Sequence, residues 1–205
     1  MKFHDTVYVV DDDPAIRDSL PLLLEQEDIS VVTFASANTF LDAIDQTKPR
    51  CCAIIDIRMP DLDGLQLQAE ITRRGILLPV IFLTGHGDIP MSVRAIKSGA
   101  VDFLSKPVTG HALLESIHTA LLESEQLFSR SEANQSARSS MDNLTDRERD
   151  VMTLAIKGLS NKEIARRLDI SHRTVEIHRA RVMHKTGART LIDLVHIAEA
   201  SSLST

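Results

Sequence analysis

The stretch CCAIIDIRMPDLDG, residues 51–64, decides the fold of the first half of the chain. Its apolar beginning predicts a buried strand over Cys52–Asp56, because short apolar runs bounded by turn residues are typical of strands covered on both faces. After a polar turn, apolar residues at helical spacing predict a helix over Gly64–Arg74. A buried strand followed closely by a helix is the repeating unit of parallel α/β sheets.

The same alternation continues on both sides of this stretch. Further strands are predicted over Thr6–Val10, Ser30–Phe34, Pro79–Thr84 and Val101–Leu104. The remaining helices are predicted over Pro14–Glu27, Ser36–Gln46, Asp88–Ser98 and Thr109–Glu125. Five strands alternating with five helices predict an α/β doubly wound fold, in which helices cover both faces of a five-stranded parallel sheet.

The rest of the chain has a different pattern. Apolar periodicity fades over Ser124–Asn143, where six of the twenty residues are Ser, so this segment is predicted to be a linker that is helical at its start. Four helical segments follow, and their starts are marked by two capping boxes and two further capping residues. The sequence therefore predicts a first domain over residues 1–124, a linker over 125–143 and an all-α domain of four helices over 144–205. The capping boxes are Thr145 with Glu148 and Ser160 with Glu163, and the other caps are Ser171 and Thr190.

Charge and composition narrow the class of protein. Residues 1–143 carry 12 Lys and Arg against 21 Asp and Glu, whereas residues 144–205 carry 11 against 8. An acidic front and a basic tail suggest two modules with different partners, the second being nucleic acid. No apolar run has the length of a membrane span or the pattern of a signal peptide. The two cysteines, Cys51 and Cys52, lack the spacing of a metal-binding or redox pair, so we interpret them as buried thiols. We therefore expect a cytoplasmic location, and no membrane partner.

Acidic residues and one lysine follow three of the predicted strands. Asp11, Asp12 and Asp13 end the first strand, Asp56 ends the third, and Lys106 follows the fifth. Parallel strand ends meet at one edge of a sheet, and carboxylates gathered there repel one another unless a hard cation such as Mg²⁺ joins them. A carboxylate facing a cation can attack a phosphoryl group. The alternative is that these acids only cap helices, which is the role expected of Asp13 before Pro14.

Four motifs in order, VVDDD, DIRMPDLDG, TGHGD and FLSKP, resemble the receiver domain of two-component response regulators over residues 5–125, in particular its FixJ-type subgroup. The resemblance implies a flavodoxin-like fold and a phosphoryl group received by Asp56 from a histidine kinase. It also implies Mg²⁺ held by Asp11, Asp12, Asp56 and the backbone carbonyl of Arg58. Lys106 would pair with the phosphate, Thr84 would donate a hydrogen bond to it, Phe103 would be the switch aromatic, and the Lys106–Pro107 bond would be cis.

A helix, a short turn and a second helix are predicted over Ser160–Thr186, with a shared buried face. The segment LTDRERDVMTLAIKGLSNKEIARRLDISHRTVEIHRARVMHKTGA resembles the LuxR/NarL-type output domain over residues 144–200, except that Thr186 replaces a usual Leu. The resemblance implies that the helix from Ser171 enters the major groove of double-stranded DNA, where Arg179 could read guanine and Lys162 and Lys185 could contact phosphates. The expected DNA-contacting residues are Lys162, His172, Arg173, Thr174, His178, Arg179, Arg181 and Lys185.

The predicted function is that of a phosphorylation-controlled transcription factor, not an enzyme. Phosphorylation of Asp56 would cause homodimerisation through the Asp88–Ser98 helix and the Val101–Leu104 strand, and the dimer would bind an operator and could contact RNA polymerase. One alternative is a phosphatase or phosphotransferase that passes through an aspartyl phosphate, but Arg58 stands where such enzymes have a second acid. The other alternative is a DNA-binding protein whose receiver no longer responds to phosphate.

Overall fold

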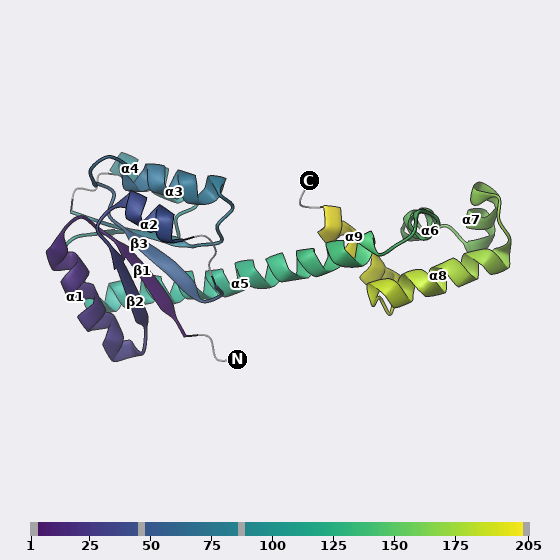
Figure 1. The fold of residues 1–205 in the computed structure, drawn as a ribbon, viewed down its shortest axis with the longest axis horizontal. Coiled ribbons are helices and arrows are strands. Elements are labelled where there is room, and N and C mark those ends of the chain that lie inside the picture. The colour runs from purple at the N-terminus through teal and green to yellow at the C-terminus, as the bar shows by residue number, and fades with distance from the viewer. Residues whose placement is uncertain (1–3, 45–47, 86–88, 203–205) are drawn as a thin grey trace. The chain divides into compact units, whose positions relative to one another are not determined.

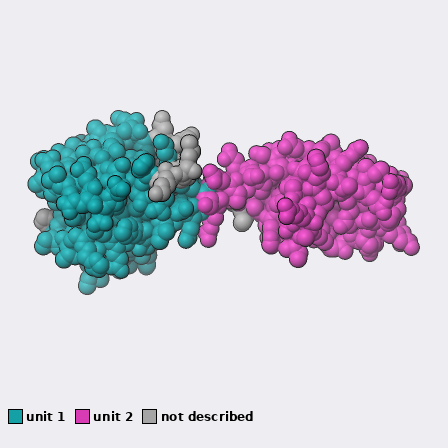
Figure 2. Space-filling view, turned by 90° about the horizontal axis from the view of Figure 1, so that it is seen from below, with its two compact units in different colours: residues 1–128 teal, residues 129–205 magenta. Residues whose placement is uncertain are grey.

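The computed structural model describes residues 4–44, 48–85 and 89–202. The chain divides into two compact units, residues 1–128 and residues 129–205 (Figure 2). Each unit has its own buried clusters of apolar side chains.

The first unit contains a parallel sheet of five strands, as the alternating pattern predicts, and β1, β2 and β3 are labelled in Figure 1. The strands lie in the order β2-β1-β3-β4-β5. The chain moves from β1 to β2 on one side and then places β3 on the other side of β1. In such sheets ligands bind where the direction of winding reverses, beyond the carboxyl ends of the strands. The strands are β1 Thr6–Val10, β2 Ser30–Phe34, β3 Cys51–Ile55, β4 Val80–Thr84 and β5 Asp102–Ser105.

Helices cover both faces of the sheet because successive strand residues point to opposite sides. Val7 and Val9 of β1 pack in one cluster with side chains of α1 and α5, while Tyr8 and Val10 pack in the other with side chains of α2, α3 and α4. In Figure 1, α1 and α5 lie on one face of the sheet, and α2, α3 and α4 lie on the other. The helices of this unit are α1 Pro14–Leu24, continued by a 3₁₀ turn Glu25–Glu27, α2 Ala37–Ala43, α3 Gly64–Arg73, α4 Ile89–Lys97 and the first part of α5 Gly110–Asp142, which continues into the second unit from residue 129.

Helix α5 is longer than predicted and occupies the segment expected to be a linker. Residues 111–142 contain neither Gly nor Pro, so nothing in the backbone interrupts the helix. The linker was predicted because apolar periodicity is lost in this segment. Such a loss indicates that a helix no longer has a buried face, and it does not indicate that the helix ends. Two other predicted helix limits, Gln46 and Asp88, lie outside the described residues.

The second unit contains the four predicted helices α6 Asp146–Ile156, α7 Asn161–Leu168, α8 His172–Thr186 and α9 Leu191–Ser202. Both capping boxes form, Ser171 caps α8, and Gly187 ends α8 in the left-handed conformation with φ 71°. The predicted buried face is confirmed: Ile164 and Val175 are fully buried, and Ala165, Leu168 and Ile170 pack against their cluster. Val182 is also buried, in a second cluster with residues of α6 and α9.

Within the described ranges, no helix combines the length and the apolar character that crossing a membrane requires.

Candidate functional site

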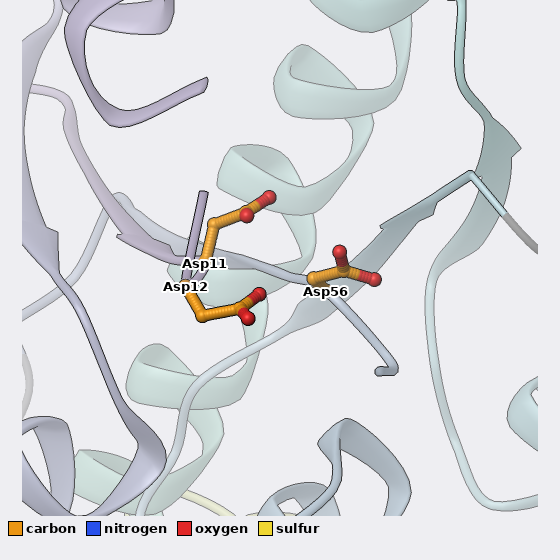
Figure 3. A group of neighbouring side chains, drawn as sticks. All are labelled: Asp11, Asp12 and Asp56. Carbon is orange, nitrogen blue, oxygen red and sulfur yellow. The ribbon is translucent and has the colours of Figure 1, made fainter. Parts of the chain in front are cut away.

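Three carboxylates converge at the edge of the sheet where the strands end (Figure 3). Val10 of β1 lies beside Ile55 of β3 in register, so Asp11 and Asp56 both come one residue past the paired ends. An oxygen from each of Asp11, Asp12 and Asp56 lies within 4.8 Å of the others. The predicted gathering of these acids is therefore what the parallel register produces.

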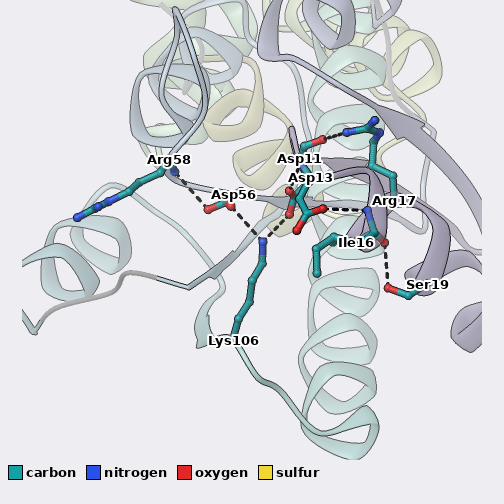
Figure 4. Close-up of polar contacts among 9 residues, drawn as sticks. Asp11, Asp13, Ile16, Arg17, Ser19, Asp56, Arg58 and Lys106 are labelled. Atoms are coloured by element: carbon teal, nitrogen blue, oxygen red, sulfur yellow. Dashed lines mark hydrogen bonds and ion pairs between the residues drawn. The ribbon is translucent and has the colours of Figure 1, made fainter.

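Lys106 follows β5 and joins two of these carboxylates (Figure 4). Its ammonium donates hydrogen bonds to Asp11 at 2.7 Å and to Asp56 at 3.0 Å. The side chain of Asp11 is 3% exposed and that of Asp56 is 11% exposed, so water screens these charges weakly. Asp12, by contrast, is exposed. The result is a charged site that opens to solvent on the side of Asp12.

Titration of the buried groups follows from this packing. Burial raises the pKa of Asp11, although the hydrogen bond from Lys106 opposes the rise. Burial acts to lower the pKa of Lys106, but the hydrogen bonds to Asp11 and Asp56 outweigh it and the pKa is raised. Lys106 therefore carries a positive charge at neutral pH. One ammonium beside three carboxylates leaves a negative site whose oxygen donors suit Mg²⁺.

The backbone around the acids is held by short local hydrogen bonds. Asp11 accepts one from the N–H of Asp13, and Asp56 accepts one from the N–H of Arg58, at 2.9 and 3.2 Å. Asp13 itself caps α1 by accepting from the N–H of Ala15 at 2.9 Å, which confirms its predicted role. The N–H of Arg58 thus lies beside the Asp56 carboxylate, and the predicted role of the Arg58 carbonyl stays a prediction.

Two residues that support this site were not identified from the sequence. Arg17 of α1 donates a hydrogen bond to the backbone carbonyl of Asp11 at 2.7 Å (Figure 4). Gly64 begins α3 so close to β3 that a Cβ there would lie 2.4 Å from the backbone oxygen of Asp56 and 2.9 Å from Cα of Ile57. The only sequence signal was the Asp–Gly pair at a helix start, because Gly is favoured where two backbones approach closely.

Thr84 and Phe103 lie on the two strands next to β3. Thr84 ends β4 and is 1% exposed, and its carbonyl accepts a hydrogen bond from the N–H of Lys106 at 2.8 Å. Phe103 of β5 is half-buried, pairs in register with Phe82, and packs with the cluster beneath α4. The Lys106–Pro107 bond is cis, as expected. The predicted changes of Thr84 and Phe103 on phosphorylation stay predictions, and residues 86–88 of the TGHGD motif lie outside the described residues.

In the second unit, α8 has one buried and one exposed face. Val175, Val182 and Thr186 are buried. The hydroxyl of Thr186 donates to the carbonyl of Val182 at 2.8 Å, so replacing the usual Leu leaves no unpaired polar group. The exposed side of α8 consists of His172, Arg173, Glu176, Ile177, Ala180, Arg181, His184 and Lys185.

Of the predicted DNA-contacting residues on α7 and α8, Lys162, His172, Arg173, Arg181 and Lys185 are exposed. Thr174 is half-buried, and its hydroxyl lies 2.8 Å from that of Ser171, within the cap of the helix. His178 is also half-buried, and its Nδ1 is buried without a hydrogen-bond partner among the described residues.

Two of the residues predicted to contact DNA, Arg179 and Lys185, form hydrogen bonds to other residues of the same unit. Arg179 is half-buried and donates to the side-chain oxygen of Asn161, at the start of α7, at 2.7 Å. Lys185 donates to the Glu148 carboxylate at 2.7 Å and to the carbonyl of Asn143 at 3.0 Å. These bonds connect α8 to α7 and to the start of α6, a role that the sequence analysis did not predict.

The ion pair between Lys185 and Glu148 lies at the start of α6. Glu148 is 3% exposed and is also the capping-box carboxylate of α6, accepting from the N–H of Thr145 at 2.9 Å. The hydrogen bond from Lys185, together with that from Thr145, lowers the pKa of Glu148 to about 2. Glu148 is therefore ionised throughout the physiological range.

Comparisons with known proteins match both units. The family model of the response regulator receiver domain matches residues 7–118, and that of the bacterial regulatory proteins of the luxR family matches residues 142–198. The transcriptional regulatory protein FixJ of Bradyrhizobium diazoefficiens is 43% identical over 94% of this chain and 93% of its own length. TdiR of Thauera aromatica is 40% identical over 96% of this chain and 86% of its own length.

Solved structures agree. The structure of the response regulator StyR aligns with a TM-score of 0.81 and 42% identity, over 96% of this chain and 99% of that one. Full-length FixJ from B. japonicum aligns with a TM-score of 0.59 and 41% identity, over 97% of this chain and 98% of that one. The similarity thus runs through both units.

Proposed function

The chain belongs to the two-component response regulators that carry a receiver domain and a LuxR-type DNA-binding domain, and from this premise we propose how its two sites work. The protein is a transcriptional regulator and not an enzyme. Its receiver implies a kinase partner, and its helix-turn-helix implies DNA.

Asp56 is the proposed phosphoacceptor, and a sensor histidine kinase is the proposed donor. A carboxylate oxygen of Asp56 attacks the phosphorus of the phosphohistidine, so that a P–O bond forms and the P–N bond breaks. The observation that carries this assignment is the pairing of Lys106 with both Asp11 and Asp56. The ammonium beside the Asp56 carboxylate would stabilise the negative charge of the phosphoryl group. Asp11, Asp12, Asp56 and the backbone carbonyl of Arg58 would hold Mg²⁺, which neutralises charge on the transferring phosphoryl group.

Phosphorylation would change the site through charge. The phosphoryl group adds nearly two negative charges and new acceptor oxygens. Lys106 then turns from Asp11 toward the phosphate, and the Thr84 hydroxyl donates to it. Phe103 moves into the space that Thr84 leaves and alters the surface of α4 and β5. The equilibrium between the two states shifts tenfold for each ~1.4 kcal/mol of differential stabilisation.

The surface of α4 is the proposed dimer contact. Three of its apolar side chains, Ile89, Val93 and Ile96, are 80%, 45% and 48% exposed. They lie at helical spacing beside Arg94 and Lys97, a mixture typical of an interface that forms and separates. Met91 and Val101, also expected in this contact, are half-buried and pack into the two clusters beneath the surface.

DNA recognition is assigned to α8, with Lys162 of α7 at the phosphate backbone. Exposed basic residues of the two helices, among them Lys162, His172, Arg173 and Arg181, support this assignment. A single module buries only about 600–1,000 Å² on DNA, so two copies on neighbouring half-sites bind more tightly and selectively. Contact with RNA polymerase would follow at the promoter. We place the protein in the cytoplasm, where the bacterial chromosome lies.

Beryllofluoride with Mg²⁺, a mimic of the phosphoryl group, tests this function in the full-length chain. Sedimentation should show a monomer that becomes a dimer, and DNA affinity should rise in parallel. The matched control is Asp56→Asn, which should respond in neither measurement. If the wild type binds DNA equally well with and without the mimic, the receiver does not control DNA binding and the phosphorylation-independent alternative is correct.

A further inference from the structure

The exposed face of α8 contains an acid and apolar residues besides its basic residues. Contacts between basic side chains and DNA phosphates give these residues no role. Arg173, Ile177, Ala180 and His184 follow one another at three- and four-residue intervals, on the side opposite Val175 and Val182. Glu176 lies next to this stripe and is exposed. An acid on a DNA-binding surface is repelled by phosphates and lowers affinity for every sequence.

We infer that Glu176 and Ile177 determine the operator sequence, Glu176 by accepting a hydrogen bond from the exocyclic amine of a cytosine and Ile177 by packing on the methyl group of a neighbouring thymine. This inference rests on the proposed entry of α8 into the major groove. There cytosine presents an amine donor, and thymine presents its C5 methyl group. The carboxylate of Glu176 can accept a hydrogen bond from the cytosine amine, and the apolar side chain of Ile177 can pack on the thymine methyl group.

The fold does not require Glu176 for its stability. Its contacts are with Arg173 at 3.3 Å and with Nδ1 of His172 at 3.6 Å, all on the first turns of α8. The three side chains are 43–82% exposed, and ion pairs of this kind contribute little to folding. The guanidinium of Arg173 does, however, hold the carboxylate in place and offsets its repulsion from the DNA backbone. The carboxylate of Glu176 is thus held on the surface without a role in folding, as we expect of a group that contacts DNA bases.

Ile177 and Ala180 form the apolar centre of the stripe. Ile177 is 42% exposed. Ala180 is exposed and has the shortest side chain on this face, so the backbone of α8 can approach the base edges closely at this point. An apolar centre between charged residues matches the thymine methyl group, which is the apolar feature of the major groove.

Basic residues lie beside this centre. A surface cavity of about 490 Å³ beside the stripe is lined by Thr145, Glu148, Ala180, Arg181, His184 and Lys185. Arg181 and His184 of this cavity are suited to the phosphates of DNA, whereas Lys185 is held by Glu148. The exposed Lys162 of α7 offers a further phosphate contact. Glu176 and Ile177 would then lie over the base edges, away from the phosphates that repel an acid.

Selection from a library of randomised half-sites tests the role of Glu176, with the full-length chain and beryllofluoride. The wild type should enrich cytosine at one position. Glu176→Gln should enrich adenine there, because a Gln amide bonds to N6 and N7 of adenine, and Glu176→Ala should lose the preference at that position alone. Asp150→Asn, which removes an exposed acid from α6, is the control for charge and should enrich the same sites as the wild type.

The role of Ile177 is tested by removing only the C5 methyl group of the thymine. Replacing the neighbouring thymine with deoxyuridine should weaken the wild type about fourfold, the factor expected for burial of one such group. It should not weaken Ile177→Ala, which should already bind the thymine operator less tightly than the wild type.

Two outcomes contradict the inference. Glu176→Gln could enrich the same bases as the wild type while binding all sequences more tightly, in which case Glu176 only repels phosphates. Deoxyuridine could weaken the wild type and Ile177→Ala equally, in which case Ile177 does not contact the methyl group. If the wild type enriches no sequence at all, the proposed DNA recognition by α8 fails as well, and this result distinguishes the two failures.

Discussion

The acidic site and the exposed face of α8 are assembled in opposite ways. The acidic site takes Asp11, Asp56 and Lys106 from the ends of three strands, and each charge is in contact with another. The face of α8 comes from fifteen consecutive residues of one helix, and its side chains are exposed to solvent even where they pair, as Glu176 does with Arg173 and Lys185 with Glu148. A site gathered by a sheet therefore depends on backbone packing, whereas a helix surface depends on which side chains the neighbouring helices engage. The predictions below test this difference.

The largest expected effect is at the acidic site. Asp56→Asn should abolish incorporation of a phosphoryl group from a small phosphodonor, because an amide cannot act as the nucleophile. Asp13→Asn should leave incorporation unchanged, since Asp13 caps α1. Radiolabel bound per chain measures both variants, and label retained at full stoichiometry in Asp56→Asn would refute the assignment of the phosphoacceptor.

A change in backbone packing should also impair this site. Gly64→Ala places a Cβ 2.4 Å from the backbone oxygen of Asp56, so α3 or the end of β3 must move. We expect the free energy of unfolding of the first unit to fall by about 1–3 kcal/mol, with slower phosphorylation. Urea unfolding and phosphoryl incorporation measure the two effects.

Gly110→Ala is the matched control for this substitution. Its Cβ would lie 3.4 Å from the side chain of Leu23, an ordinary contact, so it should change neither quantity appreciably. If both variants behave alike, close approach of α3 to β3 does not determine the position of Asp56.

In the second unit, the pair of Glu148 and Lys185 should make stability depend on pH. The folded pKa of Glu148 is about 2 and its ordinary value is 4.5, so its stabilising effect is present above pH 4.5 and is lost as pH falls toward 2. Glu148→Gln should lower the free energy of unfolding by about 1–2 kcal/mol at pH 7. The difference from the wild type should shrink below pH 4.5.

Urea unfolding at several pH values measures this difference. Asp150→Asn, which removes an exposed acid from the same helix, should show a much smaller difference. A difference for Glu148→Gln that stays constant from pH 7 to pH 2 would mean that the charge of Glu148 does not stabilise the unit.

The smallest effects should separate Arg179 from Lys162. Arg179→Ala removes the bond to Asn161 and loosens α8 from the start of α7. It should weaken binding to all operators by about 1 kcal/mol without changing base preference. Lys162→Ala should flatten the slope of log K against log salt by about one unit. Titrations of matched and mutated operators at several salt concentrations measure both, and a relaxed base preference in Arg179→Ala would show instead that Arg179 reads a base.

The sequence alone was sufficient for the order of elements. Strands buried on both faces are continuous apolar runs, and helix starts carry their own capping residues, so CCAII, VIFLT and both capping boxes were recognisable locally. The acids at the strand ends could also be foreseen to meet, because parallel strands end at one edge. The length of α5 was not foreseen, since its part after Ser124 lacks the apolar periodicity on which the prediction of a helix depends.

The tertiary structure decided which side chains are engaged inside the protein and which remain available. The sequence marks Arg179 and Lys185 only as basic residues on a helix, yet both are bound to residues of α7 or α6 more than fifteen positions away. It likewise marks Gly64 only as a residue that starts a helix, although its contact with Asp56 leaves no room for a Cβ. Local patterns report backbone preferences over a few residues. Partners distant in the chain meet only when the elements pack, and the packing determines the use of each side chain.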